Sequence, residues 1–147
     1  MKGCPARLTG MTSQPTSRVL EQPVAMQCVD RHGRAIELDV IFEYDPVDPY
    51  AVWVRFPRSI RWAMCRSLLS RGLTDACGDG DVRITPGVDR TGRSVVVLEF
   101  RSPDGYLIGR AGTSQVFRFL TRTLAAVPFG TETVDVDALI RELLADL

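Results

Sequence analysis

The sequence predicts an α+β fold in which antiparallel β-sheet strands are followed by two C-terminal helices. From residue 24 to residue 111, apolar side chains alternate with polar ones in short segments, which is the period of half-buried strands. From residue 113 onward, apolar residues recur every three or four positions, as they do on one face of a helix. A run of strands followed by a run of helices is typical of α+β domains.

Residues typical of turns separate the expected strands. A tight turn over residues 31–34 contains Gly33, which can adopt positive φ. Two Asp-Pro pairs in residues 45–49 form a stiff corner, because each proline fixes its own φ and restricts the aspartate before it. The order Ser-Pro-Asp-Gly over residues 102–105 suits a type I turn. Strands are expected over residues 24–28, 36–44, 51–56, 60–65, 81–85, 94–101 and 106–111.

The helical segments have recognisable ends. Residues 66–73 are expected to form a short helical turn that ends at Gly72. The first long helix begins near Thr113 or Ser114 and ends at Pro128, with an apolar stripe made of Val116, Leu120, Leu124 and Val127. The second helix carries an apolar face made of Val136, Leu139, Ile140, Leu143 and Leu147.

Length and composition frame the domain organisation. A chain of 147 residues can bury a core without disulfides or metals, so we expect one domain over residues 21–147. A disordered N-terminal arm is expected over residues 1–20, because this part is rich in Pro, Gly, Ser and Thr; Met11 is an alternative start to Met1. The chain has no apolar run of 18 residues and no signal-peptide core, so we expect a cytoplasmic protein without membrane insertion.

Few residues suit catalysis or metal binding. The cysteines form no Cys-x-x-Cys pair and are interpreted as free thiols; they are Cys4, Cys28, Cys65 and Cys77. A cysteine nucleophile with His32 as base stays open, although a lone cysteine in an apolar strand is usually a small hydrophobe. A single histidine and scattered cysteines argue against zinc. Asp75, Asp79 and Asp81 lack the spacing of a calcium loop and suggest a polar turn. We therefore expect no enzyme activity, metal or cofactor.

One segment is a candidate for partner binding. Between residues 51 and 74 there are five arginines and no acidic residue, with two tryptophans among them. Arginine and tryptophan are enriched in the hot spots of protein interfaces, and the same pair can stack bases and neutralise phosphates. The third interpretation is a buried tryptophan pair with a solvated arginine rim. The candidate residues are Trp53, Arg55, Arg61, Trp62, Arg66 and Arg71. The balance of 18 basic and 18 acidic residues argues against nucleic acid as the partner.

Several short motifs occur in series along the chain. They are Tyr-Asp-Pro-Val-Asp-Pro-Tyr-Ala-Val at residues 44–52, Arg-Ser-Leu-Leu-Ser-Arg-Gly-Leu at 66–73, Gly-Asp-Val-Arg-Ile at 80–84, Ser-Pro-Asp-Gly at 102–105 and Val-Pro-Phe-Gly-Thr-Glu at 127–132. In this order they resemble the motifs of the SsgA-like proteins of actinobacteria. Ser67 and Arg71 depart from the pattern where acidic residues are usual, and Phe129 replaces a common second proline.

The resemblance implies a function as well as a fold. It implies a non-enzymatic, cytoplasmic protein that acts at the division septum, where it localises or controls the FtsZ-ring machinery during sporulation-linked septation. It also implies a homotrimer with a fold similar to Whirly-type proteins, and partners in the cell-division machinery or among other SsgA-like proteins. Because Whirly-type proteins bind single strands, a single-stranded nucleic-acid-binding module is the alternative.

Overall fold

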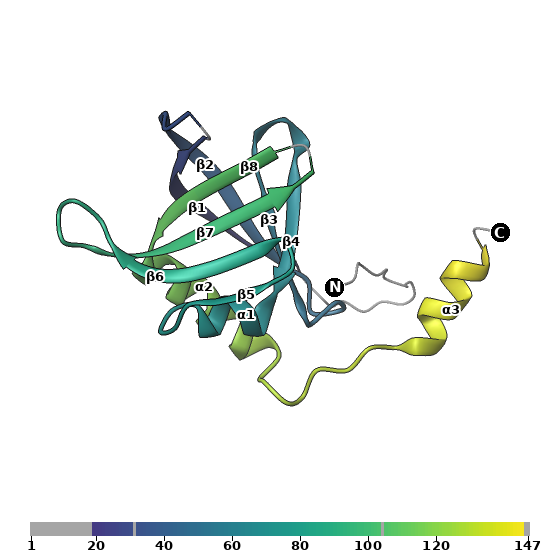
Figure 1. Ribbon diagram of the computed structural model, residues 1–147. Coiled ribbons are helices and arrows are strands. Elements are labelled where there is room, and N and C mark those ends of the chain that lie inside the picture. The colour runs from purple at the N-terminus through teal and green to yellow at the C-terminus, as the bar shows by residue number, and fades with distance from the viewer. Residues whose placement is uncertain (1–18, 31, 104, 146–147) are drawn as a thin grey trace.

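The computed structural model describes residues 19–30, 32–103 and 105–145 (Figure 1). The described strands are β1 (Leu20–Val29), β2 (Ala35–Tyr44), β3 (Ala51–Arg55), β4 (Arg61–Cys65), β5 (Cys77–Asp79), β6 (Val82–Val88), β7 (Ser94–Ser102) and β8 (Gly105–Gly112). The described helices are the 3₁₀ turn η1 (Pro57–Ser59), α1 (Arg66–Arg71), α2 (Thr113–Ala126) and α3 (Val136–Ala145). None of these helices is long and apolar enough to cross a bilayer.

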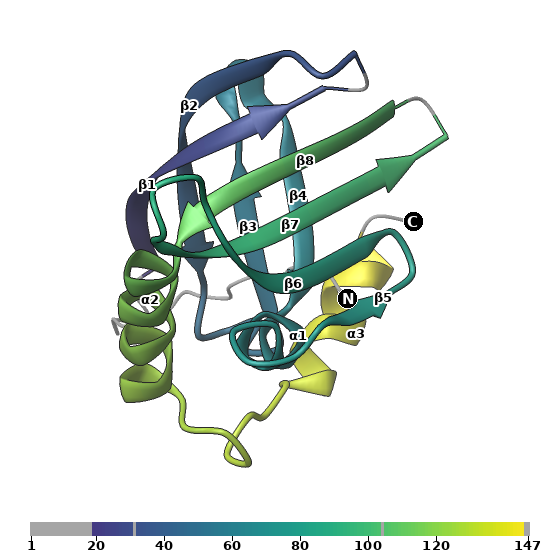
Figure 2. The same ribbon diagram turned by 60° about the vertical axis from the view of Figure 1, so that its left-hand side comes forward.

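The strands form one antiparallel, 8-stranded sheet in the order β4-β3-β2-β1-β8-β7-β6-β5. Strands β1 to β4 form one meander and strands β5 to β8 form a second. The two meanders join through pairing of β1 with β8, so the first strand of the chain lies in the middle of the sheet. The sheet curls into a half-barrel, with α1 and α2 at one end (Figures 1 and 2).

The core fills the concave side of this sheet. On β1, the side chains of Val24, Met26 and Cys28 point inward and are buried, while their neighbours are exposed or partly exposed, as strand alternation requires. Helix α2 covers one end of the core, where Phe119 meets Phe42 edge to face with ring centroids 5.4 Å apart. This burial explains why α2 carries the apolar stripe seen in the sequence.

The chain leaves the body after α2. Residues 127–132, which we call the strap, run along the outside of the body, and α3 stands apart from the sheet beyond them (Figure 1). Helix α3 exposes a row of large apolar side chains, namely Val136, Ile140, Leu143 and Leu144. An apolar helix face without cover is unusual for an isolated chain.

The structure confirms the α+β class and most predicted elements, with some corrections. Strand β5 was not predicted, and β1 begins at Leu20, four residues before the predicted start of that strand. The predicted arm lies outside the described residues as far as residue 18. Gly33 has the expected positive φ, 80°. The similarity to the Whirly-type fold stays a prediction.

Candidate interaction surface

Strands β3 and β4 place three of the candidate residues on the outer, convex face of the sheet. In the β3–β4 register, Trp53 lies opposite Ala63 and Arg55 lies opposite Arg61. Val52 and Val54, which alternate with Trp53 and Arg55 along β3, are fully buried. Since successive side chains of a strand point to opposite faces, Trp53, Arg55 and Arg61 share the outer face.

Two glutamates complete this group. Glu43 of β2 is paired with Trp53 in the register, and its carboxylate lies 2.8 Å from Nη1 of Arg55 and 3.5 Å from Nη2 of Arg61. Glu21 of β1 lies farther away, with its Oε2 3.9 Å from Nη2 of Arg55. We call Trp53, Arg55, Arg61, Glu43 and Glu21 the outer-face cluster.

The outer-face cluster holds its arginines in fixed positions. The guanidinium of Arg61 lies 4.1 Å from the centroid of the Trp53 ring, within the range of a cation–π contact. Ion pairs and ring stacking restrict the rotamers of side chains that would otherwise be mobile on a surface. A partner that binds here therefore orders fewer side chains, which lowers the entropic cost of binding.

Trp62 lies on the opposite face. It is paired with buried Val54 in the register, and its ring packs against Phe100 of β7 with centroids 5.1 Å apart. Its ring is half-buried at the edge of the core. The two tryptophans are both half-buried but have different environments, because Trp62 packs against the core and Trp53 stacks with Arg61 on the outer face.

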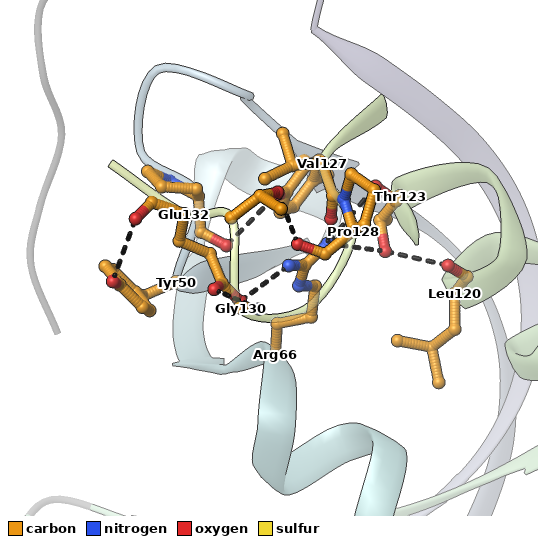
Figure 3. A network of polar contacts seen from close by, with 11 residues as sticks. Tyr50, Arg66, Leu120, Thr123, Val127, Pro128, Gly130 and Glu132 are labelled. Atoms are coloured by element: carbon orange, nitrogen blue, oxygen red, sulfur yellow. Dashed lines mark hydrogen bonds and ion pairs between the residues drawn. The ribbon is translucent and has the colours of Figure 1, made fainter. Parts of the chain in front are cut away.

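Arg66, one of the candidate partner-binding residues, is not part of the outer surface. It is the first residue of α1, and its side chain is 1% exposed. Its Nη1 donates to the carbonyl oxygens of Thr123 at 3.1 Å and Val127 at 2.7 Å. Its Nη2 donates to Oε2 of Glu132 at 2.8 Å. Figure 3 shows these groups converging on the guanidinium.

Aromatic rings complete the surroundings of Arg66. The guanidinium lies 5.0 Å from the ring centroid of Tyr44 and 4.6 Å from that of Phe129. We call Arg66, Thr123, Val127, Glu132 and these two rings the Arg66 network. Three motifs that are far apart in the sequence meet in it: the double-proline corner, the start of α1, and the strap. One donor of Arg66 is unsatisfied: its Nε is buried and has no hydrogen-bond partner among the described residues.

The Arg66 network changes the pKa values of its members. The pKa of Glu132 is lowered from its ordinary value of 4.5, first by a hydrogen bond from its own backbone and then by Arg66. Burial raises the pKa of Tyr44 to about 12, so its hydroxyl stays protonated and donates to the carbonyl oxygen of Pro49 at 2.9 Å. The corner and the strap are therefore both fastened by polar contacts in a largely buried region.

The remaining candidates have ordinary surroundings. Arg71 is exposed in the last turn of α1, where a cation suits the helix dipole. Burial raises the pKa values of the Cys28 and Cys77 thiols, which disfavours a reactive thiolate. His32 is exposed, and the side chain of Asp79 lies outside the described residues. Within the described part of the chain, no group of three or more His, Cys, Asp and Glu residues is placed to hold a metal ion.

These features define a class of protein. The chain is a small α+β protein with a curled antiparallel sheet, an organised arginine–tryptophan surface, and a C-terminal strap fastened by a buried arginine. It belongs to the SsgA family, because the family model described as Streptomyces sporulation and cell division protein, SsgA, matches residues 38–132.

Relatives with known names agree with this assignment. The chain is 36% identical over 121 residues to "Sporulation-specific cell division protein SsgB" of Frankia casuarinae, which covers 78% of this chain and 84% of that protein. It is 38% identical over 109 residues to the protein of the same name in Streptomyces coelicolor, covering 70% of this chain and 79% of that protein.

Solved structures agree as well. The SsgA-like sporulation-specific cell division protein from Thermobifida fusca superposes with a TM-score of 0.74 at 33% identity, covering 90% of this chain and 98% of that chain. A structure reported as "Mutations in SsgB correlate to longitudinal cell division during sporulation of Streptomyces coelicolor" gives a TM-score of 0.75 at 31% identity, covering 82% of this chain and 97% of that one.

Proposed function

We propose that this chain is a non-enzymatic protein that localises or controls the FtsZ-ring machinery at the division septum during sporulation-linked septation. Its membership of a sporulation and cell division family supports the process. The outer-face cluster is the observation that supports action by contact, since fixed arginine and tryptophan side chains are typical of protein interfaces. In this proposal the protein is cytoplasmic and gathers at septa, and its partner is a division protein or another SsgA-like protein.

The proposal is tested by removing the two arginines of the outer-face cluster. We expect a fluorescent fusion of the Arg55→Ala/Arg61→Ala variant to lose its septal position in the sporulating host, while circular dichroism of the purified variant stays unchanged. Arg101→Ala is the matched control, because Arg101 is also exposed, lies 3.7 Å from Glu99, and has its guanidinium 5.2 Å from the ring centroid of Tyr106. Normal septal position of the double variant contradicts the proposal.

Single-stranded nucleic acid remains the competing partner, since Arg61 stacked on Trp53 resembles a platform for a base. Glu43 opposes this function, because it lies between the two arginines and repels phosphates. We expect an oligothymidylate to bind weakly and to be released steeply by salt. Tight binding at physiological salt that Trp53→Ala abolishes in a folded protein overturns the protein-partner proposal.

We also propose that the chain self-associates, as a homotrimer, through the uncovered face of α3. The support is the row of exposed apolar side chains on a helix that stands apart from the body. Light scattering is expected to return a mass well above that of one 16.3 kDa chain. Ile140→Glu/Leu143→Glu is expected to yield monomers, whereas Asp137→Ala on the polar side is not. A wild-type monomer at tens of micromolar contradicts this proposal.

A further inference from the structure

The turn between β3 and β4 has a backbone that its sequence does not favour. Arg58 and Ser59 both lie in the left-handed region, with φ values of 68° and 63°. All other residues with positive φ in the described part of the chain are glycines, namely Gly33, Gly80, Gly92 and Gly130. Elsewhere the protein therefore uses the residue that adopts this conformation without strain, and here it does not.

The surrounding contacts do not explain why glycine is missing. Both residues are exposed, and the turn is closed by the backbone alone, through the N–H of Phe56 and the carbonyl oxygen of Ile60 at 2.7 Å. None of the ion pairs formed by described residues includes Arg58. Because strain without a local benefit tends to occur at functional positions, the side chains at this tip are candidates for contacts outside the chain.

The tip continues the outer-face cluster along the strands. Arg55 and Arg61 are the last register pair before the turn, so Arg58 follows directly beyond them. Ile60 beside it is 53% exposed, although it is large and apolar. Whereas Glu43 neutralises part of the charge of Arg55 and Arg61, Arg58 forms no ion pair with any residue that the structure describes. The tip thus presents an unneutralised cation next to an exposed apolar side chain.

We propose that Arg58 and Ile60 determine which partner binds, and that the partner offers an acidic protein segment with an apolar side chain. The inference rests on the proposed function of the outer-face cluster and adds the residues that select its protein partner. A nucleic acid fits less well, because it would place phosphates near Glu43 and leave Ile60 uncovered. A protein segment with carboxylates for Arg58 and an apolar residue for Ile60 satisfies both.

Two substitutions to glycine distinguish an effect on the stability of the fold from the loss of the contact between Arg58 and the partner. Arg58→Gly and Ser59→Gly both relieve the left-handed strain, so we expect both to raise Tm by roughly 2–6 °C. Only Arg58→Gly removes the cation. We expect the Ser59→Gly fusion to stay at septa and the Arg58→Gly fusion to leave them, despite its higher stability. Arg58→Lys, which keeps the charge, is expected to restore part of the septal signal.

A binding assay tests the chemistry of the partner. The probes are a fluorescent 12-residue peptide of alternating Glu and Leu, the same peptide with Gln for Glu, and a 12-mer of thymidylate. We expect the acidic peptide to bind best, and Arg58→Gly to weaken it about tenfold while Ser59→Gly leaves it unchanged. An acidic peptide that binds no better than the neutral one, or an oligonucleotide that binds more tightly and depends on Arg58, overturns the proposed chemistry.

The two proposals fail in different ways. If Arg55→Ala/Arg61→Ala loses the septal position but Arg58→Gly keeps it, the proposal that Arg58 selects the partner is wrong. The proposed function then stands. If both of these variants stay at septa, both proposals are wrong. Should Arg58→Gly fail to fold, Arg58→Asn replaces it, since asparagine tolerates the left-handed region, and its septal signal decides in the same way.

Discussion

The protein contains two arginine–glutamate contacts of the same length in different surroundings. Arg55 lies 2.8 Å from Glu43 in the outer-face cluster, and Arg66 lies 2.8 Å from Glu132 in the Arg66 network. The first arginine side chain is 40% exposed and the second is 1% exposed. Water stabilises Arg55 with or without its partner, whereas Arg66 depends on protein groups alone. The distance between charges therefore does not reveal their role, and burial does.

The largest expected effect comes from substituting Arg66, the buried arginine of this comparison. Arg66→Ala removes the side-chain donor to the carbonyl oxygen of Val127 and one of two donors to that of Thr123, which also accepts from the N–H of Val127. It also removes the guanidinium that lies against the rings of Tyr44 and Phe129. Removing one partner of a buried ion pair typically costs about 3–5 kcal/mol. We expect a loss of that size in the free energy of unfolding, measured by urea denaturation.

Arg71→Ala is the matched control for this experiment, because Arg71 is exposed at the other end of the same helix. Its effect should stay within about 0.5 kcal/mol, as for most surface substitutions. Equal effects of the two substitutions would remove the distinction between buried and exposed arginines.

A smaller effect is expected from the charge of Glu132 and its dependence on pH. Since the folded state lowers the pKa of Glu132, the carboxylate contributes stability above its ordinary pKa of 4.5, and this contribution is lost as pH falls through the lower value. Glu132→Gln should therefore destabilise the protein at pH 7, and the difference from the wild type should shrink under acid. Urea denaturation of both proteins at several pH values measures this.

Other acidic groups do not affect the pH-dependent difference in stability between the wild type and Glu132→Gln. Asp30 and Asp89 also have lowered pKa values, because Asp30 accepts a hydrogen bond from the backbone of Arg34 and Asp89 accepts one from the side chain of Thr91. Both are present in the wild type and in the variant, so their contributions cancel. A difference between the two proteins that does not change with pH would show that the charge of Glu132 is unimportant.

The smallest effect is expected for the Arg55–Glu43 pair of the outer-face cluster. A double-mutant cycle of Arg55→Ala and Glu43→Gln should give a coupling energy of about 1 kcal/mol or less, because Arg55 is 40% exposed and water screens its charge, although Glu43 is buried. The cycle is read from urea denaturation of the four proteins at low and at physiological salt. The coupling should fall with added salt. A coupling as large as the effect of Arg66→Ala would mean that the outer-face cluster supports the fold, and its proposed role in binding would lose its basis.

The sequence predicts the elements of this fold better than the surroundings of its charges. Strand alternation predicts β2, β3 and β7 with nearly correct bounds. Strand β5 escapes prediction because its three residues contain Gly78 and are too few to show a period. The position of Trp62 on the core side depends on the β3–β4 register, which the residues alone do not specify.

The role of Arg66 escaped prediction for a related reason. Its partners Thr123 and Glu132 lie 57 and 66 residues away in the sequence, and periodicity carries no information on contacts at that range. A signal was present nonetheless. Arg66, Tyr44 and Glu132 each belong to a different motif of the resemblance, and motifs that are far apart in a chain often meet in space. Glu43 gave no such signal, since it looks like any polar residue of a strand.

The pairing of β1 with β8 has a consequence for synthesis of the chain on the ribosome. Gln27 and Arg110 are register partners, and they are 83 residues apart. Strand β1 therefore cannot pair with β8 until nearly the whole chain has been translated. Until then, one edge of β1 has no neighbouring strand. Contacts of this range slow folding, and a bare strand edge invites pairing with other nascent chains. A truncated product that ends before β8 should aggregate, even though it contains seven of the eight described strands.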